Sequence, residues 1–206
     1  MYEGTPLRKV VEYIFRTANK VGILPNEFIN DKDHVNLTYS SLFLAGEVVD
    51  FSMPKIRIKY GKEDEAIFSS EVCIMVRSIL DFTTPVSHTS SDEEKRPKLP
   101  KRIYFSCILQ LCEVIKWLIN FVSDEKNIEE VKEKIKRIPS KEALKDKRCV
   151  ILEESGILCV EHLCVLSNKI PHSMEGKSVI IRNIVDNTDE RTKEKYPYYI
   201  QKYDVE

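Results

Sequence analysis

The chain has almost no net charge. It contains 32 lysines and arginines against 33 aspartates and glutamates, which gives a formal net charge of −1 at pH 7. A molecule without an excess of positive charge does not attract nucleic acid or an anionic membrane as a whole. Binding to either would need a local basic patch, so a function based on overall charge is excluded.

The first residues lack the uninterrupted apolar run of a signal peptide, because Arg8, Lys9 and Glu12 interrupt it. The apolar stretch of membrane length, residues 103–122, contains five polar residues: Ser106, Gln110, Glu113, Lys116 and Asn120. On a helix these form one stripe, which is typical of an amphipathic helix packed in a soluble protein. We therefore expect an intracellular protein, cytoplasmic or nuclear, with no membrane partner.

Motifs of catalysis and phosphate binding are missing. Gly176-Lys177-Ser178 resembles the end of a phosphate-binding loop, but Pro171 stands where that motif needs its first glycine, and a strand-like run follows. The sequence has no Gly-x-Ser-x-Gly elbow and only four histidines. We expect no catalytic residue and no cofactor. An enzyme whose site assembles in space near His162 and His172 is the remaining catalytic alternative.

The six cysteines have apolar neighbours, which favours core positions for free thiols in a reducing compartment. Cys159, His162, Cys164 and His172 have a spacing that zinc ligands can adopt. Along an extended strand, however, Cys159 points to the opposite face from His162 and Cys164. The run also lacks the glycine turn of a structural zinc site, so no metal site is predicted.

Hydrophobic patterns predict helices and antiparallel strands in mixed order. Thr5 and Pro6 start a helix that Gly22 ends. Further helices are predicted over 103–122, over 124–138 and after Ser140. Strands are predicted over 35–43, 47–51 and 55–60, in a hairpin over 149–166, and over 178–185 and 196–205, while 66–82 fits either type. This mixture, antiparallel strands packed with several helices, is the α+β class.

A polar segment from Thr83 to Arg102, TTPVSHTSSDEEKRPKLPKR, divides two apolar-rich halves. It cannot bury enough apolar surface to offset the entropy of ordering it, so we expect a disordered loop over 83–102. Residues 1–82 offer too few elements to cover both faces of a sheet. We therefore predict a single α+β domain over 1–206, with one core built from 1–82 and 103–206 around this long flexible loop.

Two candidate signals lie in that segment. A basic cluster has the composition of a nuclear import signal: Lys95, Arg96, Lys98, Lys101 and Arg102. Ser90 and Ser91 precede three acidic residues, as in substrates of an acid-directed kinase. A phosphate there would lie within reach of the basic cluster and could mask it by charge pairing. The alternative is a linker whose charges only keep it soluble.

Lys55, Arg57 and Lys59 alternate with apolar residues, which puts three cations on one face of a predicted strand. In one interpretation they protect an edge strand against aggregation. In the other they meet phosphates or an acidic partner. Residues 44–50, with Gly46 where a strand can bend, would suit a small closed barrel of the oligonucleotide-binding type.

These features favour a non-enzymatic protein-interaction module, an adaptor or subunit of a larger intracellular or nuclear assembly. The wide apolar arc of 103–122 can either fill the core or receive a partner helix, and core burial is the commoner use. A nucleic-acid-binding protein that uses the 55–60 face is the main alternative. Its affinity would fall steeply with salt.

Overall fold

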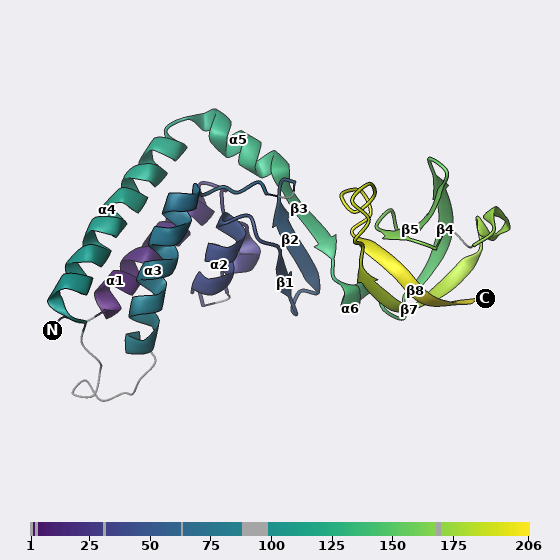
Figure 1. Cartoon of the computed structure of the whole chain (residues 1–206), viewed down its shortest axis with the longest axis horizontal. Coiled ribbons are helices and arrows are strands. Elements are labelled where there is room, and N and C mark those ends of the chain that lie inside the picture. Colours follow the sequence, from purple (N-terminus) through teal and green to yellow (C-terminus); the bar gives the residue numbers. More distant parts are fainter. Residues whose placement is uncertain (1, 3, 31, 63, 88–98, 168–169) are drawn as a thin grey trace. The chain divides into compact units, whose positions relative to one another are not determined.

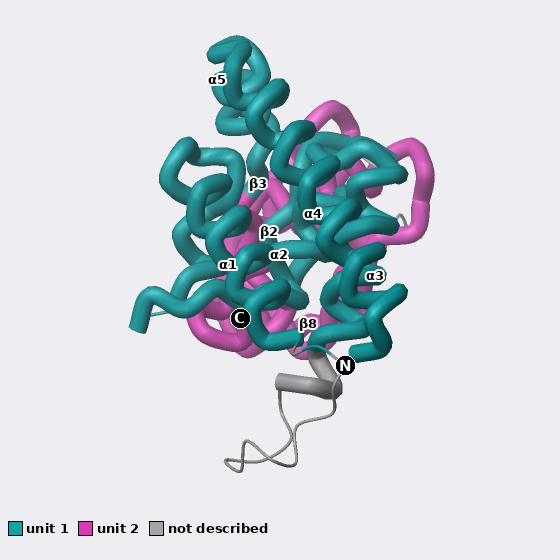
Figure 2. Tube along the Cα trace, turned by 90° about the vertical axis from the view of Figure 1, so that its left-hand side faces the viewer, with its two compact units in different colours: residues 1–49, 58–136 teal, residues 50–57, 137–206 magenta. Residues whose placement is uncertain are grey.

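The computed structural model describes residues 1–206 except 1, 3, 31, 63, 88–98 and 168–169, with no side chains described for 84–87. It contains helices and two sheets whose strands are mostly antiparallel, which confirms the α+β class (Figure 1). The chain divides into two compact units (Figure 2). Unit 1 comprises Met1–Val49 and Ile58–Lys136, and unit 2 comprises Asp50–Arg57 and Arg137–Glu206.

Unit 1 is mainly helical. Its helices are α1 (Thr5–Lys20), η1 (Asn26–Phe28), α2 (Leu37–Leu44), α3 (Ser70–Ser87), α4 (Lys101–Val122) and α5 (Glu125–Lys134). α3 packs along α4, and α1 packs against α2, α3 and α4 (Figure 1). α1 begins at the predicted Thr5-Pro6 start. Its apolar residues recur every three or four positions and form one buried side: Leu7, Val11, Ile14, Phe15 and Ala18.

The strand predicted over 35–43 is wrong, because helix α2 forms there. The side chain of Asn36 caps this helix by accepting a hydrogen bond from the Tyr39 amide at 3.1 Å. Gly46 follows the helix with a φ of +84°, and a Cβ at this position would lie 2.3 Å from the Glu65 carbonyl oxygen. Gly46 therefore shapes the exit from a helix and does not bend a strand.

The helix predicted to continue to Ile138 also needs correction. α5 ends at Lys134, and the chain then forms strand β3 (Ile135–Pro139). β3 joins β1 (Val49–Phe51) and β2 (Ile56–Tyr60) in a three-stranded sheet of order β1-β2-β3. The strands predicted over 47–51 and 55–60 are confirmed in position. Their sheet is open, so the closed barrel expected from residues 44–50 does not form there.

A closed barrel does form, in unit 2. It contains β4 (Arg148–Glu154), β5 (Ile157–Val160), β6 (Cys164–Val165), β7 (Ser178–Asp186) and β8 (Tyr198–Val205), in the order β4-β5-β6-β8-β7. The β6–β8 pair is parallel and the other pairs are antiparallel. The two-residue turn Ser155-Gly156 joins β4 to β5, with both φ angles positive as such a turn requires. The predicted hairpin and the two later strands are confirmed.

The barrel interior is apolar. Each strand contributes alternate residues to it: Cys149, Ile151, Leu158, Val160, Cys164, Val179, Ile181, Tyr198 and Ile200. The short helix α6 (Lys141–Leu144) adds Leu144, and Ser140 caps this helix as predicted, by accepting a hydrogen bond from the Ala143 amide at 3.3 Å. All six cysteines are free thiols, and four of them are buried.

Both ends of the polar segment 83–102 belong to ordered elements. Thr83 is buried in α3, where its hydroxyl donates to the Ile79 carbonyl at 2.7 Å. Leu99 is buried and pairs with Tyr2 through two backbone hydrogen bonds of 2.8 and 2.9 Å, and α4 begins at Lys101. The predicted loop is therefore too long at both ends, and residues 88–98 lie outside the described part. The helices on either side of it, α3 and α4, pack together in unit 1.

Candidate functional site

Helix α4 has apolar side chains on two opposite sides. One side is buried: Cys107, Leu111, Val114 and Leu118. The other side is exposed and carries Phe105, Leu109, Cys112 and Ile119. The exposed fractions are 46% for Phe105, 69% for Leu109 and 60% for Ile119. Core burial, the use expected from the sequence, therefore accounts for only one of the two sides.

The exposed residues have a regular spacing. Phe105, Leu109, Cys112, Lys116 and Ile119 follow one another at intervals of four, three, four and three residues. We call these five residues the α4 stripe. This 3.5-residue period is the pattern with which one helix of a coiled coil meets its partner. Lys116 is the polar member, and a single polar residue at such a position sets the register of a pairing.

The N-terminal end of the α4 stripe is held by aromatic contacts. The Tyr2 ring stacks on Tyr104 with centroids 4.7 Å apart, and its centroid lies 5.7 Å from that of Phe105 in an edge-on arrangement. The Lys101 ammonium lies 6.0 Å from the Phe105 ring centroid. These contacts limit the rotamers of Phe105, so less side-chain entropy would be lost on binding.

α4 is also long and apolar enough to cross a membrane by length and composition. A core helix of a soluble protein passes the same test, but such a helix is mostly buried, whereas only 22% of the apolar window of α4 is buried. In α4 the charged residues Glu113 and Lys116, which lie 3.9 Å apart, stand close to the middle of the helix. A membrane span would place both in hydrocarbon, which is costly.

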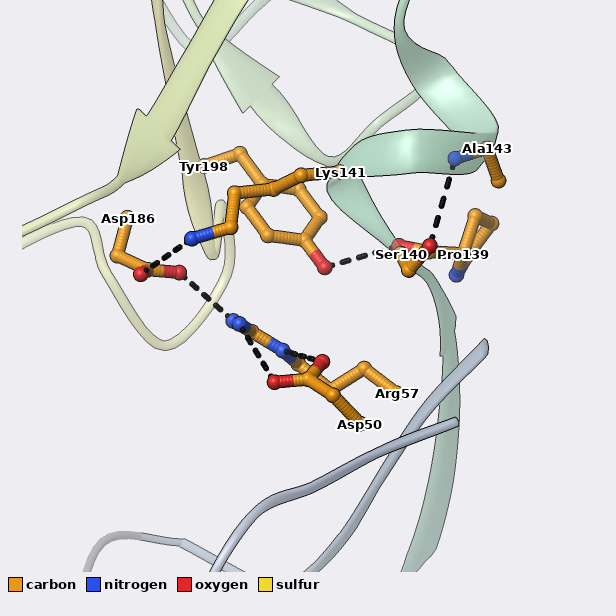
Figure 3. A network of polar contacts seen from close by, with 8 residues as sticks. All are labelled: Asp50, Arg57, Pro139, Ser140, Lys141, Ala143, Asp186 and Tyr198. Atoms are coloured by element: carbon orange, nitrogen blue, oxygen red, sulfur yellow. Dashed lines mark hydrogen bonds and ion pairs between the residues drawn. The ribbon is translucent and has the colours of Figure 1, made fainter. Parts of the chain in front are cut away.

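The predicted basic face is centred on Arg57, which is enclosed by carboxylates (Figure 3). Lys55 lies in the turn before β2, while Arg57 and Lys59 lie within β2. Arg57 donates from Nε to Asp50 and from Nη1 to Asp186, both at 2.8 Å. Its side chain is 14% exposed. The guanidinium that a phosphate would need is therefore already paired inside the protein.

Two further contacts complete this network. The Arg57 guanidinium lies 5.2 Å from the ring centroid of Tyr198, and Lys141 donates to the second oxygen of Asp186 at 2.8 Å. Burial by itself lowers the pKa of Arg57, but the hydrogen bonds that Arg57 donates to Asp50 and Asp186 outweigh it and raise the pKa above its ordinary value. These contacts give Arg57 a structural role within unit 2.

A second cluster lies on the outside of the barrel, around Glu154. The Oε2 atom of Glu154 accepts hydrogen bonds from Tyr196 at 2.9 Å and from Lys195 at 3.0 Å. Its Oε1 atom contacts Nδ1 of His162. Hydrogen bonds from His162, Lys195 and Tyr196 lower the pKa of Glu154 to about 2. Glu154, Cys159 and His162 each offer one metal-ligand atom, and these atoms lie within 4.8 Å of one another.

The expectation that Cys159 and His162 point apart is wrong for a local reason. β5 ends at Val160, and Glu161 and His162 then adopt φ angles of +54° and +56°. This tight turn, closed by a 3.1 Å hydrogen bond from the Leu163 amide to the Val160 carbonyl, brings His162 back toward Cys159.

The other two residues of the predicted zinc spacing lie elsewhere. Cys164 points into the barrel core, and His172 contacts Glu153 at 2.8 Å. Glu154, which the sequence pattern did not single out, is the third member of the cluster. His162 and His172 are both exposed, so burial does not exclude the enzyme alternative, which stays a prediction.

The outer face of β5 and β6 is covered by the chain itself. Cys159, Val165 and Tyr196 form a buried cluster there, with Leu152 and Ile157 packed against it. In five-stranded barrels of the oligonucleotide-binding type, this face and the loops beside it take the ligand. Here Tyr196, the aromatic residue of the loop between β7 and β8, is 1% exposed and cannot stack on a base.

The candidate signals are described only in part. Lys95, Arg96, Lys98, Ser90 and Ser91 lie outside the described residues. Lys101 and Arg102 are exposed at the start of α4. The import cluster and the phosphorylation sites therefore stay predictions.

Comparison with models of protein families, with curated proteins and with solved structures finds no match to this chain.

Proposed function

We propose that the protein is an interaction module that binds an acidic, amphipathic helix of a partner protein along the α4 stripe. The observation that carries this proposal is the spacing of Phe105, Leu109, Cys112, Lys116 and Ile119 on the exposed side of α4. A helix normally buries one apolar side, whereas α4 has a second one with the period of a helix seam.

The charge around the stripe argues for an acidic partner. Lys101 and Arg102 lie at the N-terminal end of the stripe, and Lys116 lies within it. Glu113, next to the stripe, offsets one of these three positive charges, so an excess of positive charge remains. A second copy of α4 would bring like charges together, which is unfavourable. A partner helix with apolar residues at the same period and a carboxylate opposite Lys116 removes this repulsion.

The length of α4 is sufficient for stable pairing. Its 22 residues span about 33 Å at 1.5 Å per residue. Helix-in-groove recognition commonly uses three or four apolar anchors over such a length. The neighbouring helices α1 and α3 pack on the opposite, buried side of α4, so the stripe is presented by a supported helix.

We propose that this module acts inside the cell, in the cytoplasm or the nucleus. The six free thiols support a reducing compartment, where disulfides do not form. The protein is then an adaptor or subunit that recruits a helical segment.

Selection from a displayed library of helical peptides tests the proposal. Each peptide has apolar residues in a heptad repeat, and the charges at the positions flanking these residues vary across the library. The full chain is the immobilised target that selects the binders. Selection should enrich helices with net negative charge. The enriched helices should lose binding to the Leu109→Asp, Ile119→Asp variant and keep it to the matched variant Ser106→Asp, Asn120→Asp, which adds the same charge beside the stripe.

Other occupants give distinct results. Concentration-dependent dimerisation that the Leu109→Asp, Ile119→Asp variant abolishes would show a second copy on the stripe. Co-sedimentation with vesicles of phosphatidylcholine and phosphatidylserine, lost in the same variant, would show a membrane. Either result, without enrichment of acidic helices, would overturn the proposal.

A further inference from the structure

We propose that Glu154, Cys159 and His162 form a binding site for a divalent transition-metal ion, with Zn²⁺ as the ion that fits best. The three residues offer a carboxylate oxygen, a thiol sulfur and an imidazole nitrogen, and these atoms lie within 4.8 Å of one another. Oxygen, sulfur and nitrogen are the three ligand types that zinc sites use. Mg²⁺ and Ca²⁺ prefer oxygen alone, which argues against them.

The cluster is close to the size of a zinc site. Zinc lies about 2.0–2.3 Å from its ligand atoms in tetrahedral geometry, so two ligand atoms on one ion are about 3–4 Å apart. Ligand atoms that lie up to 4.8 Å apart therefore need to approach by about 1–2 Å, whereas Glu154 Oε1 and His162 Nδ1, which are in direct contact, need to move apart to admit the ion. Rotation of the exposed His162 side chain can supply both movements. Three protein ligands leave the fourth position for water, as in open zinc sites.

The carboxylate of Glu154 is already oriented for this role. Tyr196 and Lys195 both donate to its Oε2 atom, at 2.9 and 3.0 Å. Its Oε1 atom faces His162 Nδ1 and is the oxygen left to contact a metal ion. Partners that hold the non-coordinating atom of a ligand are a regular feature of metal sites, because they fix its direction.

The backbone of the turn after β5 is a second, independent observation. Glu161 and His162 both have φ in the left-handed region, where a side chain with a Cβ is unfavourable. Asn-Gly is the ordinary choice for such a turn. Strained residues of this kind concentrate at functional sites. Here the strain places His162 against Glu154, while Glu161 pairs with Lys147 at 3.0 Å.

An ion can reach the cluster from the His162 side. The His162 side chain is 71% exposed, and it borders an open groove of about 320 Å³ that Arg148, Leu152 and Glu161 also line. Cys159 is buried in the cluster with Val165 and Tyr196, so His162 is the exposed member of the three. Binding replaces the thiol proton of Cys159, which leaves to solvent, so each ion bound releases one proton from sulfur.

Titration of the metal-free full chain with Zn²⁺, followed by calorimetry, tests the site. We expect one equivalent to bind, with an observed enthalpy that varies linearly with the ionisation enthalpy of the buffer, because the released proton is taken up by the buffer. His162→Gln should weaken binding at least tenfold. The matched control His172→Gln changes an equally exposed histidine that also contacts a carboxylate, and it should bind like the parent chain.

Co²⁺ provides a second readout, which reports a thiolate ligand directly in the parent chain and in variants of exposed residues. A cobalt–thiolate charge-transfer band should appear in the parent chain and in Cys112→Ser, where the replaced thiol is exposed in unit 1. The band should be absent in Cys159→Ser and reduced in His162→Gln. No stoichiometric binding, or binding that His162→Gln leaves unchanged or that His172→Gln weakens equally, would overturn the proposal.

Discussion

Arg57 and Asp186 are 129 residues apart in the chain, and a hydrogen bond of 2.8 Å joins Nη1 of one to Oδ1 of the other. Asp50 takes a second hydrogen bond from the same guanidinium (Figure 3). This pairing connects a short segment of the first half of the chain, residues 50–57, to the barrel strands within unit 2. Arg57, which the sequence pattern placed on a possible binding face, therefore forms contacts that hold segments of unit 2 together.

Replacement of Arg57 by Gln should destabilise the protein by about 2–4 kcal/mol, because Asp50 and Asp186 lose their shared partner and Tyr198 loses a stacked cation. Lys55→Gln removes an exposed charge from the same region and should change the free energy of unfolding by less than about 0.5 kcal/mol. Urea denaturation followed by circular dichroism measures both. Equal stabilities would show that the network contributes nothing.

Acid should weaken the same network through Asp186. Burial raises the pKa of this carboxyl, but the hydrogen bonds from Lys141 and Arg57 outweigh it and hold the pKa below its usual value. The ionised form is therefore favoured in the folded state, so its contribution is complete above the unfolded pKa of about 3.9. It is lost as the pH falls through the lower, folded value.

The measurement is the difference in unfolding free energy between the parent chain and Asp186→Asn, taken from pH 7 down to pH 2.5. This difference should stay constant down to about pH 4.5 and then shrink. A difference that grows on acidification would contradict the direction of the pKa shift.

Gly46 and Gly22 offer a matched comparison within unit 1. Both have φ near +85°, and a Cβ on either would come within 2.3 Å of another atom. For Gly22 that atom is the Lys132 Cε, which can swing away, whereas for Gly46 it is the Glu65 carbonyl oxygen. We expect Gly22→Ala to cost about 1 kcal/mol and Gly46→Ala about 3 kcal/mol or more. Thermal unfolding measures both, and equal costs would contradict the backbone clash.

Cleavage between α3 and α4 tests whether the two sequence halves share a core. A specific protease site introduced within residues 88–98 places one cut between α3 and α4. Because α3 packs along α4, the two fragments should remain associated through size-exclusion chromatography. Two separately folded pieces would contradict the prediction of one core built from both halves.

Local patterns predicted the elements that depend on local residues. The Thr5-Pro6 start predicted α1, and the Ser155-Gly156 turn lies within the predicted hairpin. The α2 helix was missed because the alternating pattern of residues 35–43 favoured a strand, and the capping role of Asn36 was not recognised. β3 was missed because its strand conformation depends on pairing with the distant β2.

The candidate sites were less predictable than the fold. Cys159 and His162 were considered together, but their approach depends on a left-handed turn that strand geometry does not anticipate. Glu154 lies on the neighbouring strand, where only the register of the hairpin brings it close. The sequence predicted a wide apolar arc on the helix over 103–122. It could not predict which part of this arc stays exposed, because that depends on how α1 and α3 pack against α4.

The affinity of a selected acidic helix for the α4 stripe is the most direct test of the proposed function. Labelled peptide is titrated with the full chain, and fluorescence anisotropy gives the dissociation constant. Two apolar anchors contribute about 1.5–3 kcal/mol each, so Leu109→Asp, Ile119→Asp should weaken binding at least about 100-fold. Ser106→Asp, Asn120→Asp should stay within about threefold of the parent chain. Equal affinity of the two variants would show that the exposed side of α4 is not the binding surface.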